Sequence, residues 1–383
     1  MMKLTPTQDL VRAATVSRRR LLKSAAAIGA VGFAAPLTVT NAFSSSGEMN
    51  FEGWSGYDDL PKVVAAFSKA SGIKVNAKYV DEQDTMRADA KTGAGSLDVL
   101  EPTLDRLPAW VDDGLIQPWD LKKVAGDNYL DSVPGAKAGS NADIGGQRYF
   151  LPSVWGTEAL TFNAKTKDGA YGKASLADLF DDANAGKVTV RGHSSLAAMG
   201  RVLDSQGKLP MPWLDGYKNE DNMKKLWDIA FAEAVKHKKN IAQFWKGEND
   251  AQAAFKTNGA ELGLTWDSTG FNLRKDGYGF IAPKEGAFAW SQGFVLAKGA
   301  KNAEQAYEFA KWIASAEGAA AWASGFSANP VGKGAIEKMD PEVSAFYKAA
   351  YPGDAPAKLY WWPPQSAWFL KLRGEYASKW LAA

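Results

Sequence analysis

The stretch that decides the fold runs from Met49 to Val80 and reads MNFEGWSGYDDLPKVVAAFSKASGIKVNAKYV. Its first six residues, 49–54, predict a strand that ends in a glycine loop. Apolar residues at helical spacing over residues 60–71 predict a helix that ends at Gly72. Alternating residues over 73–80 predict a second strand. Strand, helix and strand in this order are typical of an α/β domain with a mostly parallel sheet.

The same alternation continues along the chain. Further strands are expected at 98–101, 149–163, 187–192, 262–267 and 288–296. Further helices are expected at 85–91, 104–112, 195–204, 221–236, 250–257 and 302–316, with a helical tail from Pro341 that contains an aromatic turn at 360–364. Ser194 is expected to cap the helix 195–204, and the strand 262–267 is expected to end in a polar loop.

The N-terminus carries a predicted export signal. Ser17-Arg18-Arg19-Arg20-Leu21-Leu22-Lys23 precedes an apolar run rich in Ala and Gly, and small residues follow near Ala42. This order predicts a twin-arginine signal peptide over residues 1–42, with cleavage after export to the periplasm. The alternative of a membrane anchor is disfavoured, because the apolar run is shorter than the roughly 20 residues that span a bilayer.

The composition of the chain excludes several classes of function. The chain has 383 residues, a formal net charge of +2, no cysteine and two histidines. Without the signal peptide it is still too long for one ordinary core, so two domains are expected. The balanced charge gives no case for nucleic acid as a partner. Without cysteine there is neither a disulfide nor a site for a lipid anchor, and with His193 and His237 far apart a zinc site is not expected.

No catalytic set stands out. Gly192-His193-Ser194-Ser195 places serine beside histidine, but without the Gly-x-Ser-x-Gly pattern of a nucleophile elbow. A strand-to-helix turn is the favoured interpretation of this stretch. There is no phosphate-binding loop and no dinucleotide fingerprint after the first strand. We therefore expect no catalytic residues, no cofactor and no metal.

Aromatic residues are the remaining signal, with 15 Trp in the chain. Core packing is the favoured role for Trp227, Trp245, Trp312 and Trp322. Aromatic side chains also recur where predicted strands end: Trp54, Tyr57, Trp155, Trp266 and Trp290. Loops at the carboxyl ends of strands form the ligand crevice of α/β sheets, and tryptophan faces attract cations. Arg191 and His193 also follow a strand, and an arginine fork suits a carboxylate, sulfonate or phosphonate.

A series of segments, in order, carries a family resemblance: 51–57 (FEGWSGY), 67–75 (FSKASGIKV), 98–103 (DVLEPT), 151–157 (LPSVWGT), 161–163 (TFN), 264–268 (LTWDS) and 283–290 (PKEGAFAW). From Met49 to Trp380 the chain resembles the periplasmic substrate-binding proteins of ABC importers, in the branch that includes the spermidine/putrescine-binding proteins. The resemblance implies ligand binding rather than catalysis, and delivery of the ligand to a membrane permease. It also implies closure of two lobes on the ligand, with a monomer as the expected state.

The implied fold is α/β, a two-lobed periplasmic-binding-protein fold of type II, in which hinge strands join two lobes. Each lobe is a mostly parallel sheet flanked by helices. We expect lobe 1 to comprise residues 47–155 and 291–336, and lobe 2 to comprise residues 156–290 and 337–383.

The ligand that the sequence predicts differs from the polyamines that give this branch its name. In register with the polyamine binders, positions expected to be acidic hold His193, Leu196 and Gln292, and the first loop has Gly56. A buried unpaired charge costs several kcal/mol, roughly, so Arg191 nearby disfavours a polycation. We therefore expect a small zwitterion such as a betaine or dimethylsulfoniopropionate, with its ammonium or sulfonium head against Trp faces and its acid group on Arg191 and His193. An aminoalkyl phosphonate or sulfonate is also compatible, with Asp105 or Asp267 taking the amine.

The predicted ligand-binding residues are Trp54, Tyr57, Asp105, Trp155, Arg191, His193, Trp266, Asp267, Trp290 and Gln292. Three alternatives stay open. The first is a polyamine held by Glu52, Asp105 and Asp267. The second is an exported hydrolase that uses His193, and the third is an adhesive surface protein, which would be expected to show repeats.

Overall fold

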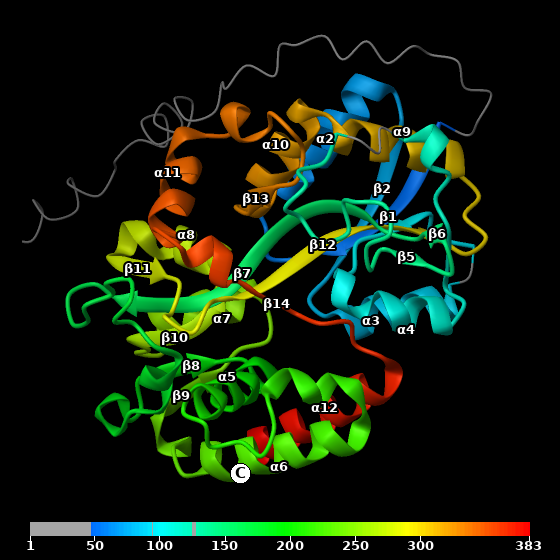
Figure 1. Ribbon diagram of the computed structural model, residues 1–383. Helices are drawn as coiled ribbons and strands as arrows, with labels where there is room; N and C mark the ends of the chain where they lie inside the picture. The colour runs from blue at the N-terminus through cyan, green and yellow to red at the C-terminus, as the bar shows by residue number, and fades with distance from the viewer. Residues whose placement is uncertain (1–46, 94, 125–127) are drawn as a thin grey trace, which may run out of the picture. The chain divides into compact units, whose positions relative to one another are not determined.

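The computed structural model describes residues 47–93, 95–124 and 128–383, so the predicted signal peptide lies outside the described residues (Figure 1). The strands are β1 Glu48–Trp54, β2 Lys74–Val80, β3 Val99–Leu100, β4 Ile116–Gln117, β5 Asp143–Ile144, β6 Gln147–Arg148, β7 Leu151–Asn163, β8 Val188–Val190, β9 Ile241–Phe244, β10 Leu262–Trp266, β11 Tyr278–Ile281, β12 Phe288–Ala297, β13 Asn329–Pro330 and β14 Tyr360–Trp361. The helices are α2 Leu60–Ser71, α3 Gln83–Thr92, α4 Leu107–Asp112, α5 Gly192–Ser205, α6 Glu220–Val235, α7 Glu248–Lys256, α8 Asp267–Leu273, α9 Ala303–Ala314, α10 Ala316–Phe326, α11 Pro341–Ala350 and α12 Ala367–Ala382. A short 3₁₀ helix, η1 Leu104–Arg106, precedes α4.

The main sheet contains two blocks of parallel strands, β2-β1-β3 and β10-β8-β9, which are joined by two central strands. The order is β2-β1-β3-β12-β7-β10-β8-β9, with β4, β11, β13 and β14 attached to the two central strands. Pairing is parallel between β1 and its neighbours β2 and β3, and between β8 and its neighbours β9 and β10. The long strands β7 and β12 pair antiparallel in the middle and cross from one block to the other (Figure 1). The described residues therefore have the predicted α/β class.

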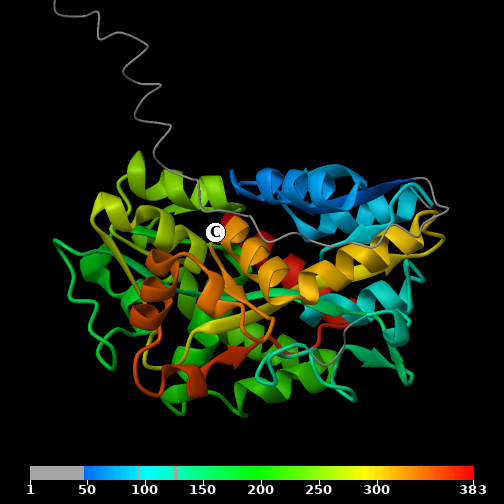
Figure 2. The same ribbon diagram turned by 90° about the horizontal axis from the view of Figure 1, so that it is seen from above.

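Two large apolar clusters flank these central strands. In the first, Phe51 of β1 packs edge-on against Trp322 of α10, with ring centroids 5.7 Å apart. The helices α2, α9 and α10 lie next to one another over this cluster (Figure 2). In the second, Trp227 of α6 stacks on Tyr376 of α12 at 5.9 Å. The helix α11, through Val343 and Tyr347, packs into the first cluster.

The first predicted helix is confirmed to the residue. The helix α2 ends at Gly72, which has a left-handed φ of 75° and donates its N–H to the carbonyl of Ser68 at 3.0 Å. Glycine adopts this conformation without the steric penalty of a Cβ atom, which explains the position of the stop.

Two predictions about chain turns are wrong. Ser194 does not cap α5, because Arg191 occupies the N-cap position and Ser194 lies inside the first turn. The strand β10 does not run into a polar loop, because the helix α8 begins directly at Asp267. The Asp267 side chain accepts the N–H of Ser268 at 3.0 Å, which satisfies one of the free backbone donors at the start of the helix.

A third prediction, the aromatic turn at 360–364, is wrong in its first half. Tyr360 and Trp361 form β14, which pairs in parallel with Phe288 and Ala289 of β12. The backbone groups of β12 hold these two residues as an extended strand, and residues 362–366 after them are irregular up to the start of α12.

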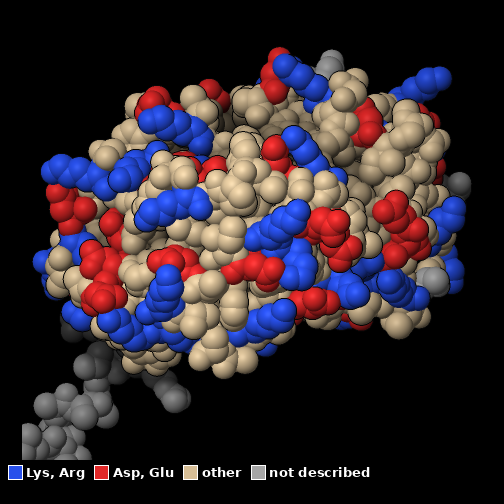
Figure 3. Space-filling view, turned by 60° about the horizontal axis from the view of Figure 1, so that its bottom comes forward, with Lys and Arg blue, Asp and Glu red and all other residues tan. Residues whose placement is uncertain are grey.

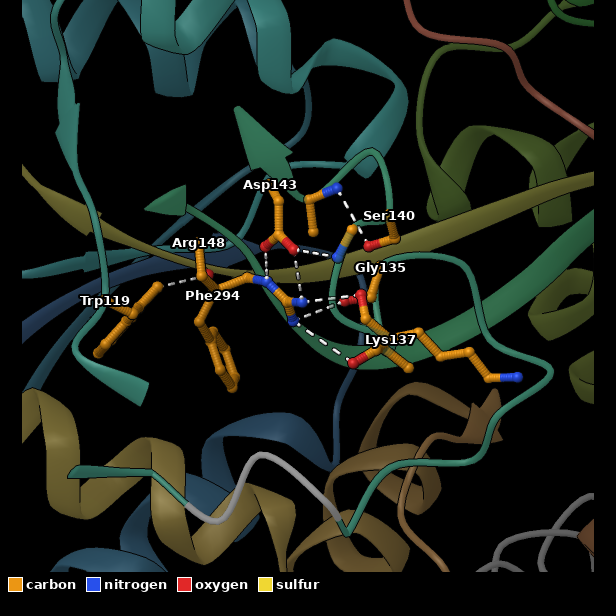
Figure 4. A network of polar contacts seen from close by, with 10 residues as sticks. Trp119, Gly135, Lys137, Ser140, Asp143, Arg148 and Phe294 are labelled. Atoms are coloured by element: carbon orange, nitrogen blue, oxygen red, sulfur yellow. Dashed lines mark hydrogen bonds and ion pairs between the residues drawn. The ribbon is translucent and has the colours of Figure 1, made fainter. Parts of the chain in front are cut away.

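A buried arginine organises the segment that precedes β7 (Figure 4). The Arg148 side chain is 4% exposed and pairs with the Asp143 carboxylate. Its guanidinium also donates to the carbonyls of Gly135 at 2.9 Å and Lys137 at 2.8 Å, and its own carbonyl accepts from the N–H of Trp119 at 2.8 Å. The contacts of the guanidinium meet the need of a buried charge for partners, so Arg148 stabilises the fold of this segment.

One face of the molecule shows how the charged side chains are distributed. On the face drawn in Figure 3, basic and acidic side chains alternate without a large area of one sign. Among the described residues, no helix has both the length and the apolar character needed to cross a bilayer.

Candidate ligand-binding site

A cavity of about 60 Å³ lies where the two parallel blocks meet the central strands. Because one water needs roughly 10–15 Å³, it has room for on the order of five water-sized groups. Its lining residues are Trp54, Tyr57, Gln83, Thr103, Asp105, Arg106, Glu158, Arg191, His193, Trp266, Trp290, Gln292, Trp362, Gln365 and Arg373. They come from the end of β1 and the loop after it, from α3, from η1 and the residue before it, from β7, β10 and β12, from the β8–α5 turn, and from the C-terminal segment that includes α12.

Eight of the ten predicted ligand-binding residues line this cavity: Trp54, Tyr57, Asp105, Arg191, His193, Trp266, Trp290 and Gln292. The structure places the other two outside the lining. The Trp155 ring packs beside Trp361 at 5.8 Å. Asp267 is fully buried and accepts the N–H of Thr157 at 3.0 Å and the hydroxyl of Tyr351 at 3.1 Å. Its carboxylate therefore holds β7 and the segment after α11 in place instead of facing the cavity.

One part of the cavity wall is aromatic. The Trp54 indole is fixed by its Nε1–H, which donates to the carbonyl of Glu101 at 2.8 Å. The Trp290 indole lies directly on Gly156 of the opposite strand, where a Cβ atom would come 2.4 Å from the ring. Among the described residues, Trp290 Nε1 has no hydrogen-bond partner. Together with Tyr57, these rings form a wall that offers one free donor and no charge.

The predicted cation cage at Trp266 already holds a cation of the chain itself. The Arg191 guanidinium lies over Trp266 at 5.2 Å and over Trp245 at 5.4 Å. Its Nη1 also lies 3.5 Å from the Glu158 carboxylate. Burial lowers the pKa of Arg191, and Glu158 opposes that shift. Burial raises the pKa of Glu158, and Arg191 opposes that shift in turn. Arg191 is thus largely neutralised within the wall.

His193 carries no charge toward a ligand at neutral pH. Burial lowers the pKa of His193 well below its usual value, and the nearby Arg191 and Arg106 lower it further. The ring lies beside Trp362, with centroids 6.3 Å apart. His193 can therefore offer a neutral hydrogen-bonding ring in this site.

Seven lining residues, most of them polar, were not predicted from the sequence: Gln83, Thr103, Arg106, Glu158, Trp362, Gln365 and Arg373. Glu158 had a readable signal, because it is the single charged residue in the buried strand β7. Arg106 and Arg373 had none, because a basic residue beside an acid or within a helix is common on any surface.

One hydrogen bond links the C-terminal segment to η1, and a second lies within that segment. The Gln365 N–H donates to the carbonyl of Asp105 at 2.6 Å. Arg373 of α12 donates through Nη1 to the Gln365 side-chain oxygen at 2.9 Å. On the other side, Arg106 donates to Asp84, an exposed carboxylate, at 2.8 Å. Burial raises the pKa of Asp105, and Arg106 opposes the shift.

The acids proposed for a polyamine are only partly in place. Asp105 lines the cavity, whereas Glu52 is fully buried outside the lining and Asp267 lies behind it. Glu158, which that alternative did not include, lines the cavity but faces Arg191. Within the described residues, no three histidine or acidic side chains are grouped so as to hold a metal ion.

Comparisons with known proteins match most of the chain. The model of the family described as bacterial extracellular solute-binding protein matches residues 62–351. The chain is 26% identical over 267 residues to the spermidine/putrescine-binding periplasmic protein of Escherichia coli, covering 69% of this chain and 71% of that protein.

Two solved structures show the same fold. The spermidine/putrescine ABC transporter substrate-binding protein PotD from Streptococcus pneumoniae has a TM-score of 0.68 at 20% identity, covering 88% of this chain and 98% of that one. The binding protein AgtB from A. tumefaciens R10, in complex with agropinic acid, has a TM-score of 0.64 at 21% identity, covering 89% and 98%. The described fold is thus that of the type II periplasmic binding proteins, and the chain belongs to the family of bacterial extracellular solute-binding proteins.

Proposed function

We propose that this protein captures a small zwitterion, such as a betaine or dimethylsulfoniopropionate, in the periplasm. It is the substrate-binding component of an ABC transporter and not an enzyme. In this proposal the chain is exported by the twin-arginine route and works as a monomer that delivers its ligand to a membrane permease. Lobe 1, residues 47–155 and 291–336, and lobe 2, residues 156–290 and 337–383, close on the ligand through β7 and β12.

The observation that carries the proposal is the charge of the cavity wall. Three arginines, Arg106, Arg191 and Arg373, line it against two carboxylates, Asp105 and Glu158. His193 adds no positive charge because its pKa is lowered well below neutrality by burial. Arg106 and Arg191 have protein carboxylates as partners, whereas the hydrogen-bond partner of Arg373 is neutral, and a ligand with an acid group supplies the missing negative charge. A polycation would bring further positive charge beside Arg373.

The uncharged part of the wall favours a methylated head group. Trp54, Tyr57 and Trp290 present rings without a carboxylate among them. A quaternary ammonium or a sulfonium has no N–H donors to satisfy, and it gains from cation–π attraction to such rings. A primary amine would need several acceptors, and Glu158 is already occupied by Arg191 at 3.5 Å. The aromatic wall thus supports a betaine-like head more than a free amine.

A polyamine is the second candidate, and the names of the relatives favour it over the first. Curated relatives at 25–26% identity are spermidine/putrescine- or putrescine-binding proteins. Asp105 and Glu158 would then hold the amines. Against this, each ammonium group would enter a cavity that already contains three arginines. The fold itself does not choose between them, because a neighbour with the same fold was solved with agropinic acid.

A thermal-shift panel separates the two candidates. Glycine betaine, dimethylsulfoniopropionate, choline, an aminoalkyl sulfonate, putrescine and spermidine are added separately to the purified protein. A ligand at 100 times its dissociation constant stabilises the folded state by about 2.7 kcal/mol, which shifts the melting temperature measurably. We expect stabilisation by the zwitterions and none by the polyamines. Stabilisation by putrescine or spermidine alone would replace the first candidate by the second.

A further inference from the structure

Building on that proposed function, we infer that Arg373 of the C-terminal helix α12 is the residue that receives the acid group of the ligand. The C-terminal segment, residues 362–373, then determines specificity for acidic over purely cationic solutes. The inference rests on what each cavity arginine already contacts.

Arg373 differs from the other two cavity arginines in its partner. Arg191 faces the Glu158 carboxylate, and Arg106 binds the Asp84 carboxylate. Arg373 is 8% exposed, and among the described residues its guanidinium donates only to the neutral amide oxygen of Gln365. Among the described residues, no carboxylate lies within 4.0 Å of its guanidinium.

A buried arginine with a neutral partner is unusual, because buried charges are normally paired. The guanidinium has five N–H donors in a fixed fork, and the bond to Gln365 uses one of them. Because Arg373 lines the cavity, a ligand carboxylate can take donors of this fork and supply the missing negative charge. The other two arginines have protein carboxylates that already do this.

The position of the fork is fixed before a ligand arrives. Gln365 accepts from Arg373 through its side chain while its backbone N–H binds the carbonyl of Asp105 at 2.6 Å. Phe369 and Leu372, on the same turn of α12, are buried in the second apolar cluster. A fork held by packing and by a neutral hydrogen bond needs little reorganisation to bind an acid group.

The experiment replaces Arg373 in two ways and uses a matched control on the same helix. Arg373→Gln removes the charge, Arg373→Lys keeps the charge without the fork, and Lys371→Gln removes an exposed charge two residues away. Each protein is melted without ligand and is titrated calorimetrically with glycine betaine, choline and acetate. Choline lacks the carboxylate of betaine, and acetate lacks its ammonium head.

We expect Arg373→Gln to melt at a temperature equal to or above that of the wild type, because it removes an unpaired buried charge. Its affinity for glycine betaine and acetate falls at least tenfold, since a hydrogen bond to a charged group is lost, while the affinity for choline, which has no acid group, does not fall. Arg373→Lys gives a smaller loss, and Lys371→Gln matches the wild type in every titration.

The inference is overturned if Arg373→Gln lowers the melting temperature and leaves betaine and acetate binding intact, because Arg373 would then be structural. A failure of the proposed function would give a different result in the same titrations. If the wild type ignores betaine but binds acetate through Arg373, the ligand class is wrong and the acid-binding role of Arg373 stands.

Discussion

Two buried arginines, Arg148 and Arg373, illustrate how the same side chain can serve a fold or a ligand. Arg148 has an acidic partner and three backbone carbonyls around its guanidinium, so nothing in its surroundings calls for a ligand. Arg373 is about as well buried but has a neutral partner and a cavity in front of it. The difference teaches that unmet charge, and not burial alone, indicates a binding residue.

The largest expected effect tests the structural side of this comparison. Arg148→Gln leaves the Asp143 carboxylate and the carbonyls of Gly135 and Lys137 without their donor. Losing one partner of a buried ion pair costs on the order of 3–5 kcal/mol of unfolding free energy, which urea denaturation measures. The control Lys137→Gln removes an exposed charge and keeps the carbonyl that Arg148 uses. Equal stabilities of the two variants would show that the Arg148 network contributes nothing.

The next effect concerns the aromatic wall. In Gly156→Ala the new Cβ atom would lie 2.4 Å from the Trp290 ring and 2.7 Å from the Asp267 carboxylate. Because both neighbours must move, we expect a loss on the order of 3 kcal/mol and a changed tryptophan emission. Gly374→Ala on α12 meets open space and should instead be stabilising by roughly 0.5–1 kcal/mol. A Gly156→Ala protein as stable as the wild type would mean that the Trp290 ring is not held on this strand.

A third change leaves Arg191, like Arg373 in the wild type, without a carboxylate that pairs with it. Glu158→Gln removes the carboxylate that lies 3.5 Å from Arg191, and Arg191 stays buried between Trp245 and Trp266. We expect the ligand-free protein to lose on the order of 2 kcal/mol of unfolding free energy, because a charged group is left unpaired. Acidic ligands should recover more of that stability in the variant than in the wild type. Chemical denaturation with and without glycine betaine checks both results, and an unchanged ligand-free stability would contradict the pairing.

The last effect is a pH dependence that arises behind the cavity. Burial raises the pKa of Asp267 to about 8, although hydrogen bonds from Thr157 and Tyr351 oppose the shift. In the unfolded chain an Asp titrates near 4, so between these values the folded state holds a proton that the unfolded state releases. This contribution to stability is full below about pH 4 and is lost as the pH rises to about 8.

Comparison with Asp267→Asn isolates that contribution. The unfolding free energy of the wild type should fall relative to the variant between pH 5 and pH 8, by up to about 1.4 kcal/mol per pH unit. Denaturation curves across this range measure the difference. Parallel pH profiles of the two proteins would show that Asp267 is ionised in the folded state.

Much of the fold could be predicted from the sequence because local patterns specify it. Gly72 marks the end of α2 through its backbone freedom, and the long apolar runs mark β7 and β12. The errors occur where tertiary contacts, and not local patterns, determine the secondary structure. Tyr360 and Trp361 become a strand only because β12 offers a free edge, which no local pattern shows.

The site residues also include some that local sequence patterns predict and others that depend on tertiary contacts. Trp54, Trp266 and Trp290 could be selected because aromatic residues at strand ends point to a crevice. The role of Arg191 could not, because its partner Glu158 lies 33 positions earlier and meets it only through the sheet. Arg373 could not be predicted as a site residue for a similar reason. Its exposure to the cavity depends on how α12 packs, and its helix carries no motif.

The central claim is that the cavity requires a negative charge on its ligand. Calorimetric titration of the wild-type protein with glycine betaine and with spermidine, at equal pH and ionic strength, tests it most directly. The charge balance of the cavity predicts saturable binding of betaine and no measurable binding of spermidine. Saturable binding of spermidine without binding of betaine would contradict the claim and would make this protein a polyamine carrier.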